Sequence, residues 1–547
     1  MAKKGKKRDG RASDLTFKWM LTTLGPEWEQ WQELAAEWMA TQHAGVDHKL
    51  SALSRFFESY LLECAPYATD IILFFKGYNG HICSTEELEA TVRKTINAPD
   101  KVSKSINHPC DFIDYIIEHH LSEEDDSGNL TPLVSNPLSK IKRQLSHTET
   151  VRNPLPYRYI QDLRQILCPL PDKAELTVIE QNLPQGESLL PSYHYRHFKH
   201  WAWAQEQTGQ GKAGGSGDWF EVEPELIDKT DPDCVWRTKE VTRDGKRITL
   251  HQIWSPVKAM VIFMKLHLPL RTYQVRMLDS GEADTWRYES GHWKLNDKHD
   301  FALGSEKRPF GKGIFRRIHD TMTGQYSTGL YINTNKTADQ NKDELERGYI
   351  IPWQNEEVLY WLEKLRNWQE KYNPIAKPTD YTTLSIKHTK NQKSQTQLES
   401  MGEIAFLLRD ASAKGEDKYK PICGDANIAS FWYQLLLELE NQLAEQGNTL
   451  DNGERLKLVV DYPEDNPESA KVATNFPLHS LRVSLITAYT MDTQLPLPVI
   501  SKLLAGHSRI LMTIYYNKIT PSVMAEKMSE AEGELEGKAK QSVRNFL

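Results

Sequence analysis

The chain has 547 residues, with 67 Lys and Arg against 75 Asp and Glu, which gives a formal net charge of −8. This length predicts about two to four domains. A content of 39% hydrophobic and 26% charged residues excludes a chain that is disordered throughout. Every apolar run is shorter than the ~20 residues that a membrane span needs, and the basic start lacks the apolar stretch of a signal peptide.

Cysteine usage points to a reducing compartment. The six cysteines are scattered and form no C-x-x-C pair, so we expect neither a disulfide framework nor a cysteine-based zinc site. These features together predict a cytoplasmic protein without a metal or another cofactor. The mildly acidic total does not exclude a nucleic-acid partner, because local patches of charge set the field at a surface.

The first 150 residues predict a basic tail and then a helical domain. Residues 1–25 begin with a run of Lys and Arg that could neutralise phosphates or simply keep the end of the chain solvated. After it, apolar residues recur at helical spacing, as in Trp28, Trp31 and Trp38. This periodicity predicts amphipathic helices that bury the tryptophans in the core of a domain over residues 26–150.

A second domain is predicted to follow a linker near residues 150–156. Its first helix is expected at Tyr159–Leu167. Two short apolar stretches, 329–333 and 348–352, flank a polar segment and predict a β-hairpin with a long tip. Residues 376–396 are rich in Lys, Thr, Ser and Gln, and this composition predicts a surface loop or an insertion.

The most informative segment lies between residues 476 and 519. His479 and Arg482 are three residues apart, so a helix places both on one face. Gly506 follows an apolar run and is expected to end a helix, which puts His507 on a fixed turn. A further helix carries a pair of tyrosines, Tyr515 and Tyr516.

This set of side chains suits the transfer of a phosphodiester. Attack on a phosphodiester concentrates charge on its non-bridging oxygens, and fixed cationic or N–H donors offset that charge. Arginine matches two oxygens with its planar fork, and a tyrosine nucleophile stores the broken bond as a covalent phosphotyrosine. Neither a metal nor ATP is then required. Each residue taken alone fits an ordinary helical core, whereas the joint spacing is much rarer.

The segment resembles the tyrosine recombinase (phage integrase) family. Residues 479–482, His-Ser-Leu-Arg, match its H-x-L-R box, and residues 505–508, Ala-Gly-His-Ser, match its L-G-H-S box with Ala for Leu. Tyr516 lies nine residues after His507, where the family has its nucleophile, and Tyr515 is the alternative one residue away.

Two more residues of the family's active site have candidates upstream. The family's first arginine is matched by Arg271 in Leu-Pro-Leu-Arg-Thr-Tyr-Gln, with Arg276 as the fallback. This box has Pro in place of the usual Gly and Gln274 in place of the usual acid. The hairpin lysine is matched by Lys336 in Asn-Lys-Thr, with Lys342 as the runner-up.

The resemblance implies a mainly α fold with a small β-sheet (α+β), in which two domains form a C-shaped clamp around DNA. Residues 26–150 would be the helical core-binding domain and residues 155–520 the catalytic domain. Unusually long spacings imply insertions near 205–250, 280–325 and 376–470. The tail at 521–547 would dock on a neighbouring protomer.

The resemblance also implies the chemistry. Arg271 and Arg482 would hold the scissile phosphate, His507 would donate to it, and Tyr516 would attack it. His479 would assist the proton transfer at the tyrosine, and Lys336 would protonate the leaving 5′ oxygen. The implied partners are double-stranded attachment sites, further copies of the chain as a dimer or tetramer on DNA, and partner recombinases or DNA-bending proteins, in the bacterial nucleoid.

Three other functions stay open from the sequence. A type IB topoisomerase would use a similar site to relax supercoiled DNA without a defined target sequence. A non-catalytic DNA-binding relative would use the fold for assembly, and a plain helical scaffold would use none of these residues chemically.

Overall fold

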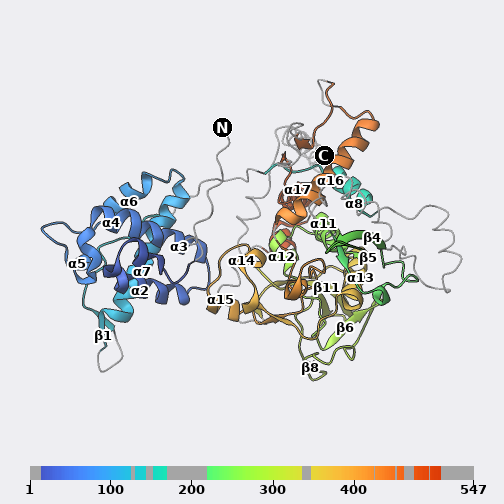
Figure 1. The fold of residues 1–547 in the computed structure, drawn as a ribbon, viewed down its shortest axis with the longest axis horizontal. Helices are drawn as coiled ribbons and strands as arrows, with labels where there is room; N and C mark the ends of the chain where they lie inside the picture. Colours follow the sequence, from blue (N-terminus) through green and yellow to red (C-terminus); the bar gives the residue numbers. More distant parts are fainter. Residues whose placement is uncertain are drawn as a thin grey trace, which may run out of the picture. The chain divides into compact units, whose positions relative to one another are not determined.

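In the computed structural model, the chain divides into two compact units (Figure 1). The first comprises Met1–Thr148, Asp339–Arg347 and Thr379–Ile404, and the second comprises the rest. The structure describes residues 14–124, 130–142, 152–168, 218–335, 346–423, 425–449, 453–460, 473–491, 493 and 495–506. Helices and small antiparallel sheets are mixed, as the α+β prediction requires.

The first unit is helical, and its longest helix is α7. Its elements up to residue 148 are α1 (Trp19–Thr23), η2 (Pro26–Trp28), α2 (Glu29–Ala40), α3 (Val46–Arg55), η3 (Phe56–Leu61), α4 (Leu62–Cys64), η4 (Pro66–Thr69), α5 (Ile71–Lys76), α6 (Thr85–Arg93), α7 (Pro99–His120), β1 (Ser122–Glu124) and β2 (Leu130–Pro132).

The core of the first unit is aromatic, as the helical periodicity predicts. Trp31 of α2 is fully buried, and its ring meets Phe57 and Phe74 edge to face at 5.9 and 5.4 Å between centroids. Its indole N–H donates to the carbonyl of Ala68 at 2.7 Å. A buried indole therefore has both apolar contacts and a hydrogen-bond acceptor, which is the arrangement that stabilises such a side chain most.

Two segments differ from the sequence-based expectation in this unit. Helix α1 lies inside the stretch expected to be a basic tail, because Phe17 and Met20 are fully buried. The segment expected to be a surface loop or an insertion forms part of the first unit, as β13 (Thr379–Asp380), η9 (Tyr381–Thr383), α14 (Ile386–Thr389), α15 (Gln395–Glu399) and β14 (Glu403–Ile404).

This late segment is hydrogen-bonded to the end of α2, the start of α3 and the turn between them. The backbone N–H of Gln392 donates to the Asp47 carboxylate at 2.8 Å, and the Thr396 hydroxyl donates to the Ala40 carbonyl at 2.7 Å. The hydroxyl of Ser394, which is fully buried, donates to the Gln42 carbonyl. Its polar composition thus serves hydrogen bonds to the helical unit, which composition alone cannot distinguish from solvation.

The second unit contains the longer strands. Its elements are α8 (Tyr157–Leu167), β3 (Trp219–Glu221), η6 (Pro224–Leu226), β4 (Trp236–Arg243), β5 (Lys246–Trp254), α11 (Val257–His267), α12 (Thr272–Arg276), β6 (Trp286–Glu289), β7 (His292–Leu295), β8 (Gly304–Ser305), β9 (Arg308–Pro309), β10 (Phe315–His319), β11 (Tyr326–Ile332), β12 (Tyr349–Ile351), α13 (Glu356–Tyr372), η10 (Gly415–Tyr419), α16 (Asp425–Glu445), β15 (Val459–Val460), β16 (Ala473–Thr474), α17 (Ser480–Met491), α18 (Leu497–Val499) and η11 (Ile500–Leu504).

Helix α11 lies at the centre of this unit, where it packs against α8, α13, α16 and α17. Nearly all of its side chains are buried, as expected for a helix that is covered on every side. The predicted helix at 159–167 is confirmed as α8, and the predicted hairpin is confirmed as β11 and β12, which pair antiparallel from Leu330↔Ile351 to Ile332↔Tyr349. The strand β10 completes this sheet in the order β10-β11-β12.

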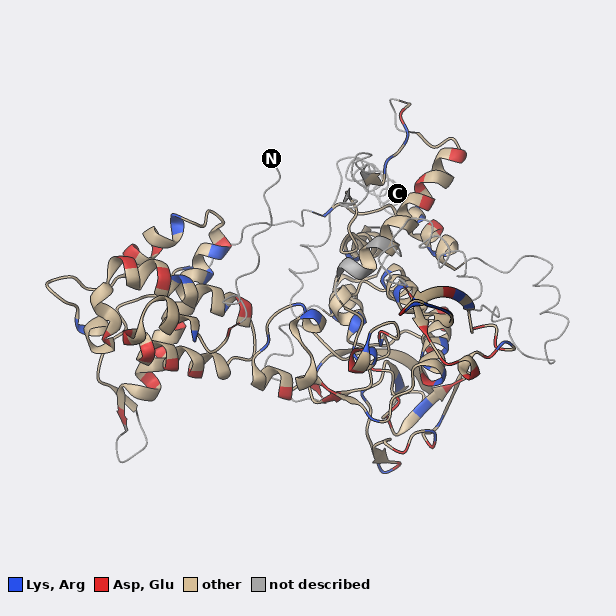
Figure 2. Ribbon diagram, in the orientation of Figure 1, with Lys and Arg blue, Asp and Glu red and all other residues tan. Residues whose placement is uncertain are grey.

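Charge is unevenly placed on these elements (Figure 2). Toward its C-terminal end, α16 carries the exposed acidic residues Glu438 and Glu445. The buried carboxylate of Glu440 instead accepts the backbone N–H groups of Leu458 and Val459 at 2.9 and 3.2 Å. Within the described ranges, no helix is both long and apolar enough to cross a membrane.

Candidate functional site

The turn between α11 and α12 carries Arg271, and buried side chains hold the backbone of this turn. The Lys265 ammonium, which is 1% exposed, donates to the carbonyl of Leu270 at 3.0 Å. The guanidinium of Arg482 donates to the carbonyl of Pro269. The backbone N–H of Arg271 donates to the side-chain carbonyl of Gln274 at 3.0 Å. Three consecutive residues of the turn are therefore fixed by charge-assisted or buried hydrogen bonds.

Arg482 joins three segments that are far apart in the sequence. It lies in the first turn of α17 and is fully buried. Besides Pro269, it donates to the carbonyl of Ala505 at 3.0 Å, immediately before Gly506. A buried guanidinium is stable only when its N–H groups have acceptors, so this residue fixes α17 against the Arg271 turn and the end of η11.

His479 lies among positive charges. Its pKa is lowered to about 3, first by burial and then by repulsion from four neighbouring cations, which are Lys265, Arg482, Arg271 and Arg152. The imidazole is therefore neutral at neutral pH, and it is a weak base as long as no anion offsets the neighbouring cations. An anionic ligand would stabilise this cluster, because its charge would offset the charges of the cations around the neutral imidazole.

The first strand of the confirmed hairpin ends at the same turn. The side-chain N–H of Gln274 donates to the carbonyl of Thr334 at 2.9 Å, just beyond the end of β11. The side chain of Asn333 donates to the carbonyl of Met277 at 2.6 Å. Both contacts connect the chain after β11 to helix α12 and its C-terminal end.

Both the backbone conformation and the nearby Tyr349 ring require a glycine at position 506. Its φ is +60°, in the left-handed region that favours glycine, as the predicted helix end demands. A Cβ at this position would lie 2.3 Å from the ring of Tyr349 in β12. The turn that precedes His507 in the sequence is therefore packed directly on the hairpin sheet.

Three of the six predicted site residues are brought together. Arg271, His479 and Arg482 lie in one cluster, as the electrostatic effects on His479 and the bonds of Arg482 require. The fallback Arg276 is fully buried and donates to the Ile422 carbonyl at 2.5 Å, so Arg271 fits the predicted role better. Lys336, His507 and Tyr516, with the alternatives Lys342 and Tyr515, lie outside the described residues. So do residues 1–13 of the predicted tail at 1–25 and the whole predicted tail at 521–547.

Sequence reasoning missed Lys265 and Arg152 and treated Gln274 only as a departure from the family pattern. Lys265 had a usable signal, because it interrupts the apolar run that ends α11, and a charge inside such a run needs a buried partner. Arg152 lies in the predicted linker. Three residues on, at Leu155, the backbone N–H donates to the Ser484 hydroxyl of α17 at 2.7 Å. No local pattern indicates that contact.

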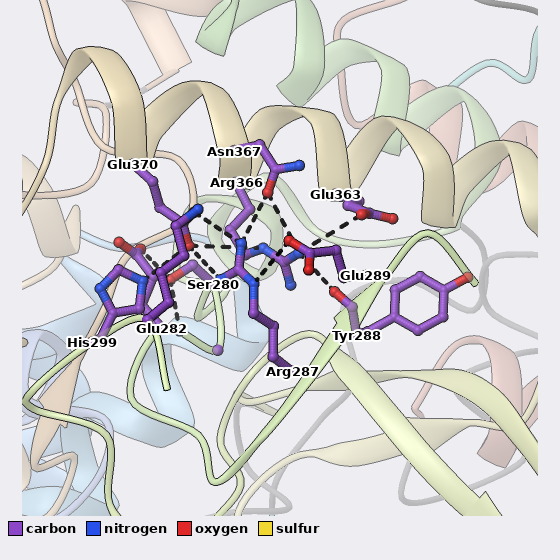
Figure 3. Close-up of polar contacts among 12 residues, drawn as sticks. Ser280, Glu282, Arg287, Tyr288, Glu289, His299, Glu363, Arg366, Asn367 and Glu370 are labelled. Carbon is purple, nitrogen blue, oxygen red and sulfur yellow. Dashed lines mark hydrogen bonds and ion pairs between the residues drawn. The ribbon is translucent and has the colours of Figure 1, made fainter. Parts of the chain in front are cut away.

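A second polar cluster of this unit surrounds Glu370 of α13 (Figure 3). The carboxylates of Glu282 and Glu370 and the imidazole of His299 have ligand atoms within 4.8 Å of one another, close enough to hold a metal ion. Arg409 contacts Glu282 at 2.5 Å, and Arg287 contacts Glu370 at 2.6 Å. These guanidinium groups already neutralise both carboxylates, so the donor set fits an internal ion-pair network better than a metal.

The charges of this network determine its protonation. Burial alone would raise the pKa of Glu370, but hydrogen bonds from His299, Arg287 and Lys298 outweigh burial and lower it well below the usual range. Glu370 is thus ionised at all ordinary pH values. The network comprises residues of β6 and α13 and of three segments, which lie before β6 (Glu282), after β7 (His299) and after β14 (Arg409). It contains none of the predicted site residues.

Comparison with models of known protein families assigns the chain to one of them. Residues 26–190 and 184–382 match the model of the family described as "Putative integrase". The match covers more than half of the chain, which therefore belongs to this family of integrases, proteins of DNA integration and recombination. It includes helices α2 to α7 of the first unit and Arg271, and it ends before His479. No curated protein and no solved structure matches the chain.

Proposed function

We propose that the protein is a site-specific tyrosine recombinase that cuts and rejoins DNA through a 3′-phosphotyrosyl intermediate. The observation that carries this proposal is the neutral imidazole of His479 among the cations Lys265, Arg271 and Arg482. Such a cluster suits a phosphodiester, whose charge grows during attack. In the described part of the chain, Nη1 of Arg271 is buried without a hydrogen-bond partner, so it has capacity for a phosphate oxygen.

In the proposed reaction, the phenolic oxygen of Tyr516 attacks the scissile phosphorus, and the bond to the 5′ oxygen breaks. His479 assists removal of the phenolic proton once the charge of the bound phosphate offsets the neighbouring cations, and Lys336 supplies a proton to the leaving 5′ oxygen. Arg271, Arg482 and His507 offset the charge on the non-bridging oxygens. A 5′ hydroxyl from a second duplex then attacks the phosphotyrosine and completes strand exchange.

The proposed assembly is a clamp around duplex DNA. The first unit would act as the core-binding domain, the second would carry the chemistry, and two or four copies would act together on their attachment sites. Accessory DNA-bending proteins are further proposed partners.

The test uses nicked suicide duplexes that carry the ends of the protein's own element, with the full-length chain. A covalent protein–DNA adduct is expected, which Tyr516→Phe abolishes and Tyr515→Phe spares. An adduct that survives the first change and is lost with the second moves the nucleophile by one residue. No adduct with the wild type, or one that neither change affects, refutes the mechanism. Relaxation of plasmids without a defined site would instead favour a type IB topoisomerase.

A further inference from the structure

The side chain of Gln274 links two segments of the site through the two halves of one amide. Its carbonyl oxygen accepts from the backbone N–H of Arg271 at 3.0 Å, and its N–H donates to the carbonyl of Thr334 at 2.9 Å. The residue is 2% exposed, so water does not compete for these bonds. Both partners are main-chain atoms, and Thr334 lies 60 residues after Gln274 in the sequence.

This bridge needs a neutral amide. An amide offers one acceptor and two donors, whereas an ionised carboxylate accepts only. At this position a carboxylate would still accept from the Arg271 N–H, but it would turn a second oxygen toward the carbonyl of Thr334. An unprotonated acid would therefore keep one contact and replace the other with repulsion, and a protonated acid would restore a donor.

We propose that Gln274 is a positioning residue, which holds the backbone of Arg271 in register with the end of β11 and so sets where the Arg271 guanidinium meets the substrate phosphate. This inference rests on the proposed function. Gln274 itself touches no substrate. Lys265 and Arg482 hold the preceding carbonyls of the same turn, and Gln274 adds a bond from this turn to the chain just beyond β11.

The experiment measures single-turnover adduct formation on the nicked suicide duplex between pH 6 and 8.5, together with binding of the intact duplex. For Gln274→Glu at pH 7.5, we expect a rate roughly tenfold below wild type and nearly unchanged affinity, because the defect is in alignment. The ratio of mutant to wild-type rate should rise as pH falls, because the protonated carboxyl regains a donor. Gln274→Leu should lose rate at every pH.

Gln369→Glu is the matched control. Gln369 is another fully buried amide, and it donates to the carbonyls of Leu407 and Arg409 at 3.1 and 3.0 Å. The same chemical change there should not alter the pH profile of the adduct rate. If Gln274→Glu follows wild type at all pH values, or if the control shows the same pH-dependent recovery, the positioning role is overturned.

A second readout separates this inference from the proposed function. Hydrogen exchange of peptides covering residues 268–277 and 326–335 should increase together in Gln274→Leu and remain unchanged in the control. Unchanged exchange at both peptides overturns the bridge. A wild-type protein that forms no adduct refutes the recombinase mechanism, while the exchange result still decides whether Gln274 holds the two segments together.

Discussion

The lowered pKa of His479 predicts a specific acid sensitivity of the second unit. The imidazole has an ordinary pKa of 6.5, and the fold lowers it to about 3. At a pH between these two values, the His479 imidazole is protonated in the unfolded chain and neutral in the folded chain. Stability from this group is therefore complete above the ordinary pKa and is lost as the pH falls below it.

The magnitude follows from one proton. Each unit between the unfolded pKa and the pH corresponds to about 1.4 kcal/mol. Going from pH 7 to pH 5 should therefore cost about 2 kcal/mol through His479. His267, whose pKa burial and Arg164 also lower to about 3, adds a similar loss that no change at residue 479 removes.

The assay is urea unfolding of wild type and His479→Gln at pH 7 and pH 5, using the transition that the substitution shifts at pH 7. The loss between the two pH values should be about 2 kcal/mol smaller in the variant, because glutamine does not titrate. His292→Gln, at an exposed position, is the control. If wild type and His479→Gln lose the same stability, the cationic and buried environment assigned to His479 is wrong.

Three further predictions concern the stability of the fold. Gly506→Ala should lower stability by roughly 1–3 kcal/mol in calorimetry, because its Cβ would meet the Tyr349 ring. Gly453→Ala is the control, since a Cβ there would lie in open space, and it should cost less. Equal losses in the two variants would contradict the packing of Gly506 on Tyr349. Glu370→Gln should cost roughly 3–5 kcal/mol at pH 7. Because the pKa of Glu370 is lowered, the wild type loses this advantage as pH falls below 4.5, so denaturation curves that stay parallel from pH 7 to pH 3 would count against the network. Trp31→Phe should destabilise the first unit by roughly 1–3 kcal/mol, because the Ala68 carbonyl loses its hydrogen-bond donor. Proteolysis measures this loss, and Trp353→Phe, at an exposed position, should cause none.

The local elements were predictable because their signals are local. The helical periodicity around Trp31 and the apolar face of α8 are encoded within a few turns of chain. The hairpin of β11 and β12 follows from two apolar stretches around a polar tip, and the left-handed Gly506 follows from a glycine after an apolar run. The spacing of His479 and Arg482 likewise indicated a helix, and Arg482 lies in the first turn of α17 with His479 immediately before it.

Only the tertiary structure decided which distant groups these elements meet. Arg482 finds its acceptors 213 and 23 residues away, and Ser394 finds its acceptor 352 residues away in the first unit. A sequence pattern indicates which face of an element is apolar, but it does not specify which remote carbonyl satisfies a buried donor. The sequence by itself therefore determined the helices, the hairpin and the residue types of the site. The fold decided that Lys265 and Gln274 hold the Arg271 turn, because every buried donor must find an acceptor among the groups that packing brings near it.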